Sequence, residues 1–412
     1  MTISIPSPVN PVRDSLLTEG EVKMWSRANT SSFAVELVMK RFLYSFVVIL
    51  LTVHTVAAQG WTWKIEKIDD AGAFPSVVAD RDGGVHASYI KIGEGVKYAF
   101  RASDSAQWFN IPIGAKAEEG FTHIAIDSLG NPNICFTAYE SLGFAQYKDG
   151  QWYLQKIGEN FGVISYTCSL AIAPDGTKSM TWYQYMSRDR ELFLHLKYAS
   201  LQSGAWLAKT IDFDGETGKW NSLVLDPQGN PHIGYSSWRR GELRYASWNG
   251  KTWSFETVDS RSHDDAQAGP PCMAVSLALA IDGTPMISYF QDQTLKFARK
   301  QGNTWKKNGI DVLSPMASAG WVALHSSLIL DSTGAPHIIY GDFGSLKHAF
   351  WDGKGWRVQV IDSGSVGQYK HSAATIAPDG TIYVVFQDPS DDSLKSAVGR
   401  LRVAAGAKTE KP

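Results

Sequence analysis

Two histidines, a tyrosine and an arginine are the side chains in this sequence that could together carry out acid–base chemistry. His325 and His371 stand at equivalent positions of two neighbouring repeats, and Tyr369 lies two residues before the second histidine. A histidine and a tyrosine can take up and return a proton, while Arg239 could neutralise a uronic acid. This combination could serve a lyase that acts on an acidic polysaccharide. No spacing among the four residues is diagnostic, so histidines that only cap strand ends or contact water are the favoured interpretation.

A second group of polar and aromatic residues lies in or beside the segments that vary most between repeats. The longest connecting segments are 260–273 and 312–324, and a long loop spans 183–195. Binding residues concentrate on loops that a rigid scaffold holds in place. The candidate ligand-binding residues are Arg188, Trp238, His263, Asp265 and Trp321.

The sequence gives little support for a metal site. The stretch Ser-His-Asp-Asp at 262–265 could hold a cation, but one short acidic loop is usually only solvated. The three cysteines have no metal-type spacing and are expected to be buried free thiols. No metal and no cofactor is therefore predicted, with a structural Ca²⁺ ion left open.

Three further histidines recur at one position of the repeat and could be mistaken for a metal cluster. They are His86, His232 and His337, and Met286 stands at the same position in another copy. A position that accepts methionine is a packing site. These histidines are therefore predicted to be structural.

A repeat of about fifty residues determines the elements that must position all these side chains. Seven copies share a glycine that an aromatic residue follows six positions later. The glycines are Gly83, Gly130, Gly176, Gly229, Gly283, Gly334 and Gly380, and the aromatic residues are Tyr89, Phe136, Trp182, Tyr235, Tyr289, Tyr340 and Phe386. Each copy contains short apolar segments separated by turn residues, which is typical of four β-strands. The pattern predicts an all-β, seven-bladed β-propeller with four antiparallel strands per blade and the aromatic residues packed between blades.

The seventh copy lacks the Trp-led fourth strand that the other six copies have. The missing segment is "WKIEKID" at residues 63–69, which precedes the first copy. If this strand pairs with the last three strands, the ring closes and no open sheet edge remains. The propeller is therefore expected to span 61–403, followed by a flexible tail at 404–412.

The copies "DPQGNPHIGY … LRYA … W" and "DSTGAPHIIY … LKHA … W" resemble the repeats of bacterial secreted β-propeller proteins. The resemblance covers residues 61–400 and implies the propeller fold. That group is functionally diverse, so the resemblance carries no catalytic residue to this chain. The turn box of sialidases, the glycine doublet of kelch repeats and the paired motifs of WD repeats are not present as repeating features.

The N-terminal region has the pattern of an export signal. Residues 39–58 begin with Lys40 and Arg41, continue with an apolar stretch at 42–53 and end in small residues. Residues 1–38 show no periodicity and are interpreted as a non-native or disordered extension. A secreted, periplasmic or cell-surface protein is expected, with a retained membrane anchor as the alternative.

The bulk composition excludes one class of partner and leaves the ligand open. With a formal net charge of −2, the chain has no electrostatic basis for binding nucleic acid. The favoured hypothesis is a monomeric, non-catalytic propeller that binds a glycan or a protein at the face carrying the long connectors. A secreted polysaccharide lyase on the same face and a purely structural surface domain are the alternatives.

Overall fold

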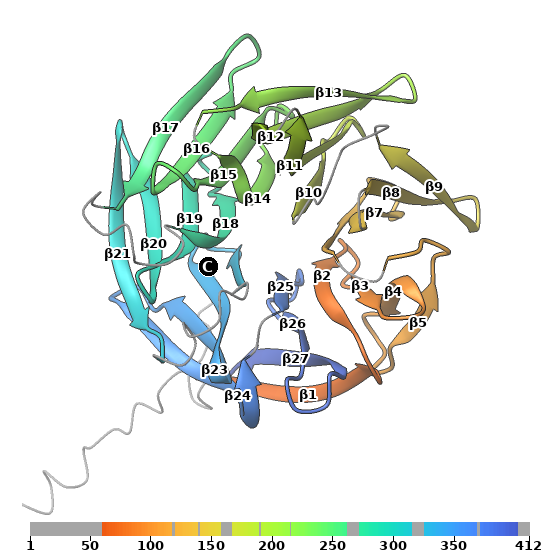
Figure 1. The fold of residues 1–412 in the computed structure, drawn as a ribbon. Coiled ribbons are helices and arrows are strands. Elements are labelled where there is room, and N and C mark those ends of the chain that lie inside the picture. Colours follow the sequence, from red (N-terminus) through yellow and green to blue (C-terminus); the bar gives the residue numbers. More distant parts are fainter. Residues whose placement is uncertain are drawn as a thin grey trace, which may run out of the picture. The chain divides into compact units, whose positions relative to one another are not determined.

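The computed structural model describes residues 60–117, 120–138, 141–157, 167–188, 191–214, 216–261, 272–314, 325–368 and 371–402. The secondary structure in these ranges consists entirely of β-strands, which form seven sheets in a ring (Figure 1). The predicted all-β, seven-bladed β-propeller is therefore confirmed. None of the described residues forms a helix able to cross a membrane. The predicted leader (1–38 and 39–58) and the predicted tail (404–412) lie outside the described residues.

Each blade runs in chain order from the ring centre outward, apart from the last. Blades 1 to 3 consist of β2 (Ala73–Ala79), β3 (Val85–Lys91), β4 (Gly95–Arg101), β5 (Phe109–Pro112), β6 (Thr122–Ile126), β7 (Pro132–Ala138), β8 (Ser141–Lys148), β9 (Gln151–Ile157), β10 (Cys168–Ile172), β11 (Lys178–Arg188), β12 (Glu191–Gln202) and β13 (Ala205–Asp212). Blades 4 and 5 consist of β14 (Thr217–Leu225), β15 (Pro231–Ser237), β16 (Glu242–Trp248), β17 (Trp253–Ser260), β18 (Met273–Leu279), β19 (Pro285–Gln291), β20 (Thr294–Gln301) and β21 (Thr304–Val312). Blades 6 and 7 consist of β22 (Ser326–Leu330), β23 (Pro336–Trp351), β24 (Trp356–Gln368), β25 (Ser372–Ile376), β26 (Ile382–Gln387), β27 (Leu394–Leu401) and β1 (Trp61–Asp69).

Blade 6 differs from the others because one long strand replaces two separate strands. The first part of β23 pairs with β22, and its last part pairs with β24. β23 therefore supplies both the second and the third strand of the blade.

The N-terminal strand closes the ring. β1 pairs antiparallel with β27 along its length, and Figure 1 shows it as the outermost strand of blade 7. Trp63 faces Gly399, where an added Cβ would lie 2.4 Å from the indole ring, so the glycine makes room for the tryptophan. The N–H of Arg402 donates to the carbonyl of Gly60 at 3.0 Å, which places the two ends of the described ring side by side. The predicted closing strand at 63–69 is confirmed and begins two residues earlier.

The core is divided among the interfaces between blades. Seven clusters of buried apolar residues are found in the described residues, and each joins two neighbouring blades. The repeated aromatic residue lies in these interfaces and is buried in every copy, from Tyr89 to Phe386. The prediction that these aromatic residues pack between blades is confirmed. The cysteines Cys135, Cys168 and Cys272 are buried and free, also as expected.

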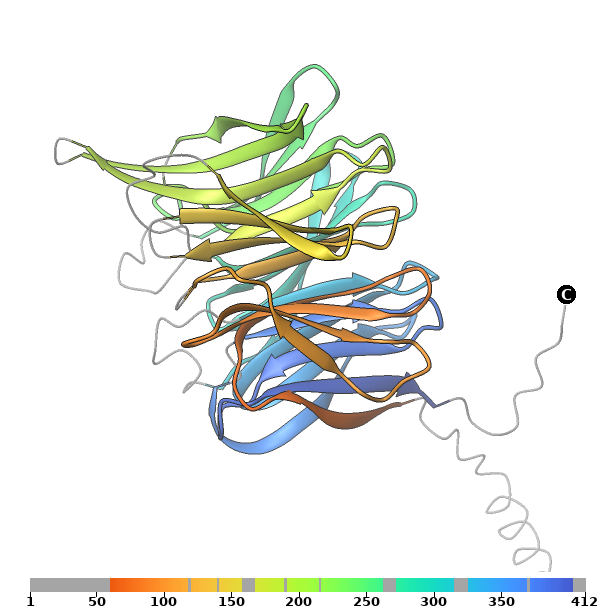
Figure 2. The same cartoon turned by 90° about the vertical axis from the view of Figure 1, so that its right-hand side faces the viewer.

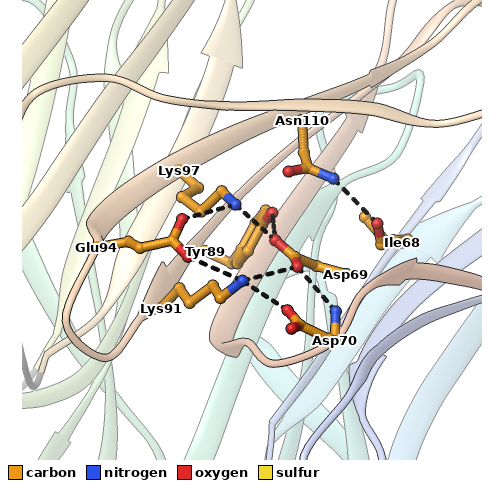
Figure 3. Close-up of polar contacts among 8 residues, drawn as sticks. All are labelled: Ile68, Asp69, Asp70, Tyr89, Lys91, Glu94, Lys97 and Asn110. Atoms are coloured by element: carbon orange, nitrogen blue, oxygen red, sulfur yellow. Dashed lines mark hydrogen bonds and ion pairs between the residues drawn. The ribbon is translucent and has the colours of Figure 1, made fainter.

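Where the repeated aromatic residue is tyrosine, its hydroxyl binds the aspartate that ends the outer strand of the preceding blade. Figure 3 shows the pair at the closing strand: Tyr89 donates to Asp69 at 2.6 Å, and Lys97 and Lys91 reach the same carboxylate at 2.7 and 3.0 Å. Burial alone would raise the pKa of Asp69, but the hydrogen bonds from Lys97 and Tyr89 outweigh it and hold the pKa below its usual range. Asp69 is therefore a charged anchor between blades 7 and 1.

The same Asp–Tyr pair recurs at three other interfaces. The hydroxyl-to-carboxylate distances are 2.6, 2.6 and 2.7 Å for Tyr235–Asp212, Tyr289–Asp259 and Tyr340–Asp311. Between blades 1 and 2 the tyrosine, the aspartate and the lysine are replaced together by Phe136, Gly114 and Gly143. An added Cβ at Gly143 would lie 2.1 Å from the Phe136 ring, so the ring fills the space that a lysine, or Arg244 in blade 4, takes elsewhere. At the two remaining interfaces the replacement is only partial, because Trp182 faces Lys197 and Phe386 faces Lys395.

Replacement of Asp259 by asparagine is expected to lower the free energy of unfolding by about 3 kcal/mol, measured by urea denaturation. The change removes the charge that accepts hydrogen bonds from Tyr289 and Lys307, each at 2.6 Å, and leaves the lysine near an uncharged amide. The matched control is Asp214→Asn, whose exposed carboxylate pairs with the exposed Arg240 and should change stability by less than about 1 kcal/mol. Equal effects of the two substitutions would contradict the anchoring role of the Asp–Tyr pair.

The three recurring histidines serve the fold. His86 bonds Asp80 of its own hairpin turn at 3.0 Å and the Tyr98 hydroxyl at 2.7 Å. His232 contacts a tyrosine and a turn aspartate in the same way, and His337 pairs with His348 at 2.9 Å. The described residues contain no group of three side chains able to hold a metal ion, in keeping with a structural role for these histidines.

Candidate binding site at the channel mouth

The seven first strands, β2, β6, β10, β14, β18, β22 and β25, surround a central channel (Figure 1). A cavity of about 180 Å³ lies between them and is lined by residues from all seven. The lining residues belong to the first halves of these strands, so the cavity is at the end where the connectors between blades arrive. The N–H of Thr137, near the end of a second strand, donates to the carbonyl of Phe121 at 2.9 Å. The loops that follow the second strands therefore lie at this same end.

Four rings from blades 1, 2, 6 and 7 and their connectors meet at this mouth. The ring centroids of Phe74 and Phe121 are 4.7 Å apart, and those of Phe74 and His371 are 4.0 Å apart. His325 stacks on Phe121 at 5.6 Å and lies 5.3 Å from His371. The structure thus brings together the two histidines of the predicted catalytic group, and it surrounds them with aromatic carbon.

His325 is held as a neutral imidazole by its surroundings. Burial lowers its pKa to about 4. Its Nε2 atom is buried and has no hydrogen-bond partner among the described residues. A histidine in this state remains uncharged near neutral pH and cannot serve there as a general acid without first gaining a proton.

The other two members of the predicted catalytic group are not seen beside the histidines. The side chain of Arg239 is 66% exposed and forms a 3.0 Å ion pair with Glu216 in the same blade. It is not among the residues that line the cavity. Tyr369 lies outside the described residues. The four-residue acid–base group remains a prediction.

Trp238, one of the predicted binding residues, stacks on a second tryptophan at the mouth. The ring centroids of Trp220 and Trp238 are 6.0 Å apart with an angle of 22° between the planes, and Trp220 lines the cavity. The Lys219 ammonium lies 4.1 Å from the Trp238 ring centroid, within the range of a cation–π interaction. The pair forms an aromatic wall beside the cavity.

The backbone at the mouth is strained at one repeated position. Phe74, Trp220 and Ala274 are equivalent residues, and they have φ angles of 53°, 47° and 51°. Each lies where the register between first and second strand shifts at a bulge. Bulky residues rarely adopt positive φ, and such residues persist only where the surrounding structure holds them. Hydrogen bonds from Thr122 to the Phe74 carbonyl and from Ser326 to the Ala274 carbonyl hold two of them in place.

The remaining predicted binding residues are not described. Arg188 ends β11, but the position of its side chain is outside the described part of the structure. His263, Asp265 and Trp321 lie in connectors that are also outside it. Their contribution to a site remains a prediction.

A ring of hydroxyl groups below the mouth was missed by the sequence analysis. In five blades a serine lies seven residues before the repeated glycine, namely Ser76, Ser169, Ser222, Ser276 and Ser327. Each Oγ accepts a hydrogen bond from a backbone N–H of a first strand in the next blade, at 3.0 to 3.1 Å. In blade 2, His123 takes this position and its Nδ1 accepts from Leu170 at 3.2 Å. We call these six residues the serine ring; aligning the repeats would have revealed it, because the position is the same in every copy.

Comparison with known proteins supports the fold alone. No family model matches the chain, and no curated protein matches it. Among solved structures, a fungal alcohol oxidase of the AA5 family in complex with copper matches with a TM-score of 0.54 at 11% identity, over 86% of this chain and 79% of that one. A protein of unknown function from Dyadobacter fermentans matches at 0.50 and 13% identity, over 82% and 99%. The Aleuria aurantia lectin in complex with Fucα1-6GlcNAc matches at 0.47 and 16% identity, over 73% and 98%.

Proposed function

We propose that the protein is an exported, non-catalytic propeller that binds a glycan at the channel mouth. The observation that carries the proposal is the strained position: Trp220, which lines the cavity, and Phe74 keep bulky rings at positive φ. Strained backbone of this kind clusters at functional sites, because the fold alone gains nothing from it. Aromatic faces beside polar groups are suited to stacking on sugar rings.

The wall formed by Trp220 and Trp238 offers a direct test. Trp220→Gly is expected to weaken glycan binding at least tenfold while the melting temperature stays within a few degrees, because glycine adopts positive φ without strain. Trp238→Ala should weaken binding similarly without altering the strained position. The control is Tyr153→Ala, an exposed aromatic residue on the outer strand β9, which should bind as the wild type does.

A glycan array with these variants, followed by titration calorimetry on the best ligand, provides the measurement. If the wild type binds a glycan and neither tryptophan variant weakens that binding, the ligand must bind elsewhere on the protein. Silence of the wild type across the array would favour a protein ligand at the same face.

A lyase on this face is the second candidate, and the close approach of His325 and His371 favours it. Against it, the pKa of His325 is lowered by burial, and Arg239 is paired with Glu216. Incubation with uronate-rich polysaccharides separates the two candidates. Ultraviolet absorbance from an unsaturated product would establish the lyase, and no product is expected from a binding protein.

A further inference from the structure

The cavity at the channel mouth is uncharged. Its described lining residues include serine, threonine, asparagine, histidine, alanine, valine and aromatic residues, and no aspartate, glutamate, lysine or arginine. Two of the lining histidines, His123 and His325, are half-buried, and burial lowers the pKa of each to about 4. They too are neutral near pH 7.

The charged groups that the structure describes near the mouth are paired with other groups. Lys219, next to Trp220, lies over the rings of Trp238 and Tyr183 at 4.1 and 5.6 Å. Burial lowers its pKa, which reflects the cost of its charge in this place. Glu216 is bonded by Arg239. None of these charges lines the cavity, so none is placed to balance a charge that enters it.

The cavity has room for a single sugar ring at most. The positive-φ position and the serine ring are two residues apart along β2, β14 and β18, so their separation along the strand is at most about 7 Å. A volume of about 180 Å³ is also well below the 300–1,000 Å³ of pockets that hold larger ligands. All seven first strands contribute residues to the cavity lining, so we expect a polymer to enter by its chain end rather than to lie across the cavity.

The floor of the cavity offers hydrogen-bond donors. The Oγ atoms of Ser76, Ser169, Ser222 and Ser276 each accept a backbone N–H, and the described residues show no bond that these hydroxyls donate. Each therefore retains one O–H for a ligand oxygen. Ether and hydroxyl oxygens satisfy such donors, whereas a buried carboxylate would also need an opposite charge.

We infer that the channel mouth takes the uncharged terminal sugar residue of a glycan chain, inserted end-on from the connector face. The aromatic residues Phe121 and Trp220 contact the ring faces, and the serine ring binds its oxygens. This inference rests on the proposed function and adds both the charge class of the ligand and the part of the chain that binds.

The test compares neutral sugars with their own uronic acids. Methyl glycosides of glucose, galactose and mannose and the matching methyl glycosiduronic acids are titrated against the full-length protein at pH 7.5 by saturation-transfer NMR. The best neutral member is expected to bind at least tenfold more tightly than its acid. For oligosaccharides of that sugar, affinity per chain should not rise with chain length, because each chain has one end that fits.

Two variants at Ala373 test whether the ligand binds in the cavity. Ala373 is the position of blade 7 where the serine ring is interrupted. Ala373 lines the cavity, so Ala373→Leu is expected to abolish binding by filling it. Ala373→Ser restores the residue found in five other blades and should bind at least as well as the wild type. If the leucine variant fails to fold, comparing neutral sugars with their uronic acids on the wild type and the serine variant still tests the inference.

The outcomes separate the two proposals. Equal or tighter binding of the uronic acids, or affinity that grows with chain length, would overturn this inference and leave glycan binding standing. Failure of every saccharide to bind would overturn both.

Discussion

A chain that lacks residues 61–69 is expected to lose its cooperative fold and to aggregate. β1 buries Trp61 and Ile68, which are 7% and 6% exposed, and carries the Asp69 carboxylate that anchors blade 1. Each large apolar side chain contributes about 2 kcal/mol when buried, and the total stability of a domain is only about 5–15 kcal/mol. The deletion also leaves β27 as an exposed strand edge. Size-exclusion chromatography and thermal unfolding by circular dichroism check the result.

A circular permutant supplies the control. Because the N–H of Arg402 bonds the carbonyl of Gly60, a short Asn-Gly turn can join the end of β27 directly to β1. A chain that starts at β2 and ends with β1 should be monomeric and melt within a few degrees of the wild type. A monomeric deletion variant with an unchanged melting temperature would contradict the closing role of β1.

Acid is expected to destabilise the protein well before its carboxylates are protonated. Burial lowers the pKa of His123 and of His325 to about 4, while an unfolded chain has histidines near 6.5. Above pH 6.5 neither state holds the proton, so the histidines have no effect. Between pH 6.5 and 4 only the unfolded state takes it up, and stability falls as the pH falls. At pH 5 each of the two histidines is expected to cost about 2 kcal/mol.

The variant His123→Ser isolates one of these contributions. Serine is the residue of the ring in five other blades and retains an acceptor for the Leu170 N–H, so stability at pH 7.5 should change by less than about 1 kcal/mol. Between pH 7.5 and 5 the variant should lose about 2 kcal/mol less than the wild type, measured by urea unfolding at both values. An equal loss in both proteins would show that His123 is not the titrating group.

The repeat alone was enough to predict the blade number and the strand that closes the ring. Each hairpin turn needs a glycine at positive φ and each interface needs an aromatic residue, so these two residue types recur in the sequence at a fixed spacing. Because the seventh copy lacks its Trp-led strand, residues 63–69 could be identified as that strand. Both halves of the Asp–Tyr pairs were visible as well, as Asp six residues after Trp and Tyr six residues after Gly. Their pairing was not, because the two residues belong to different blades.

The site was predicted less well, for two physical reasons. Positive φ at Trp220 has no sequence signal, because tryptophan is among the residues least expected in that conformation. The proximity of His325 and His371 followed from the repeat, but their burial beside Phe74 depends on packing across the channel. Several predicted residues, such as His263 and Trp321, lie in connectors whose geometry the repeat does not specify.

The hydrogen bond between Arg402 and Gly60 also determines how the ring can be attached to anything else. Both ends leave the ring together, where β1 begins and β27 ends (Figure 2). By the antiparallel order of strands, this is the face of the hairpin turns, opposite the channel mouth. A tether at either end would therefore attach to the face opposite the channel mouth. Fusion partners or immobilisation tags placed at either end should leave the mouth accessible.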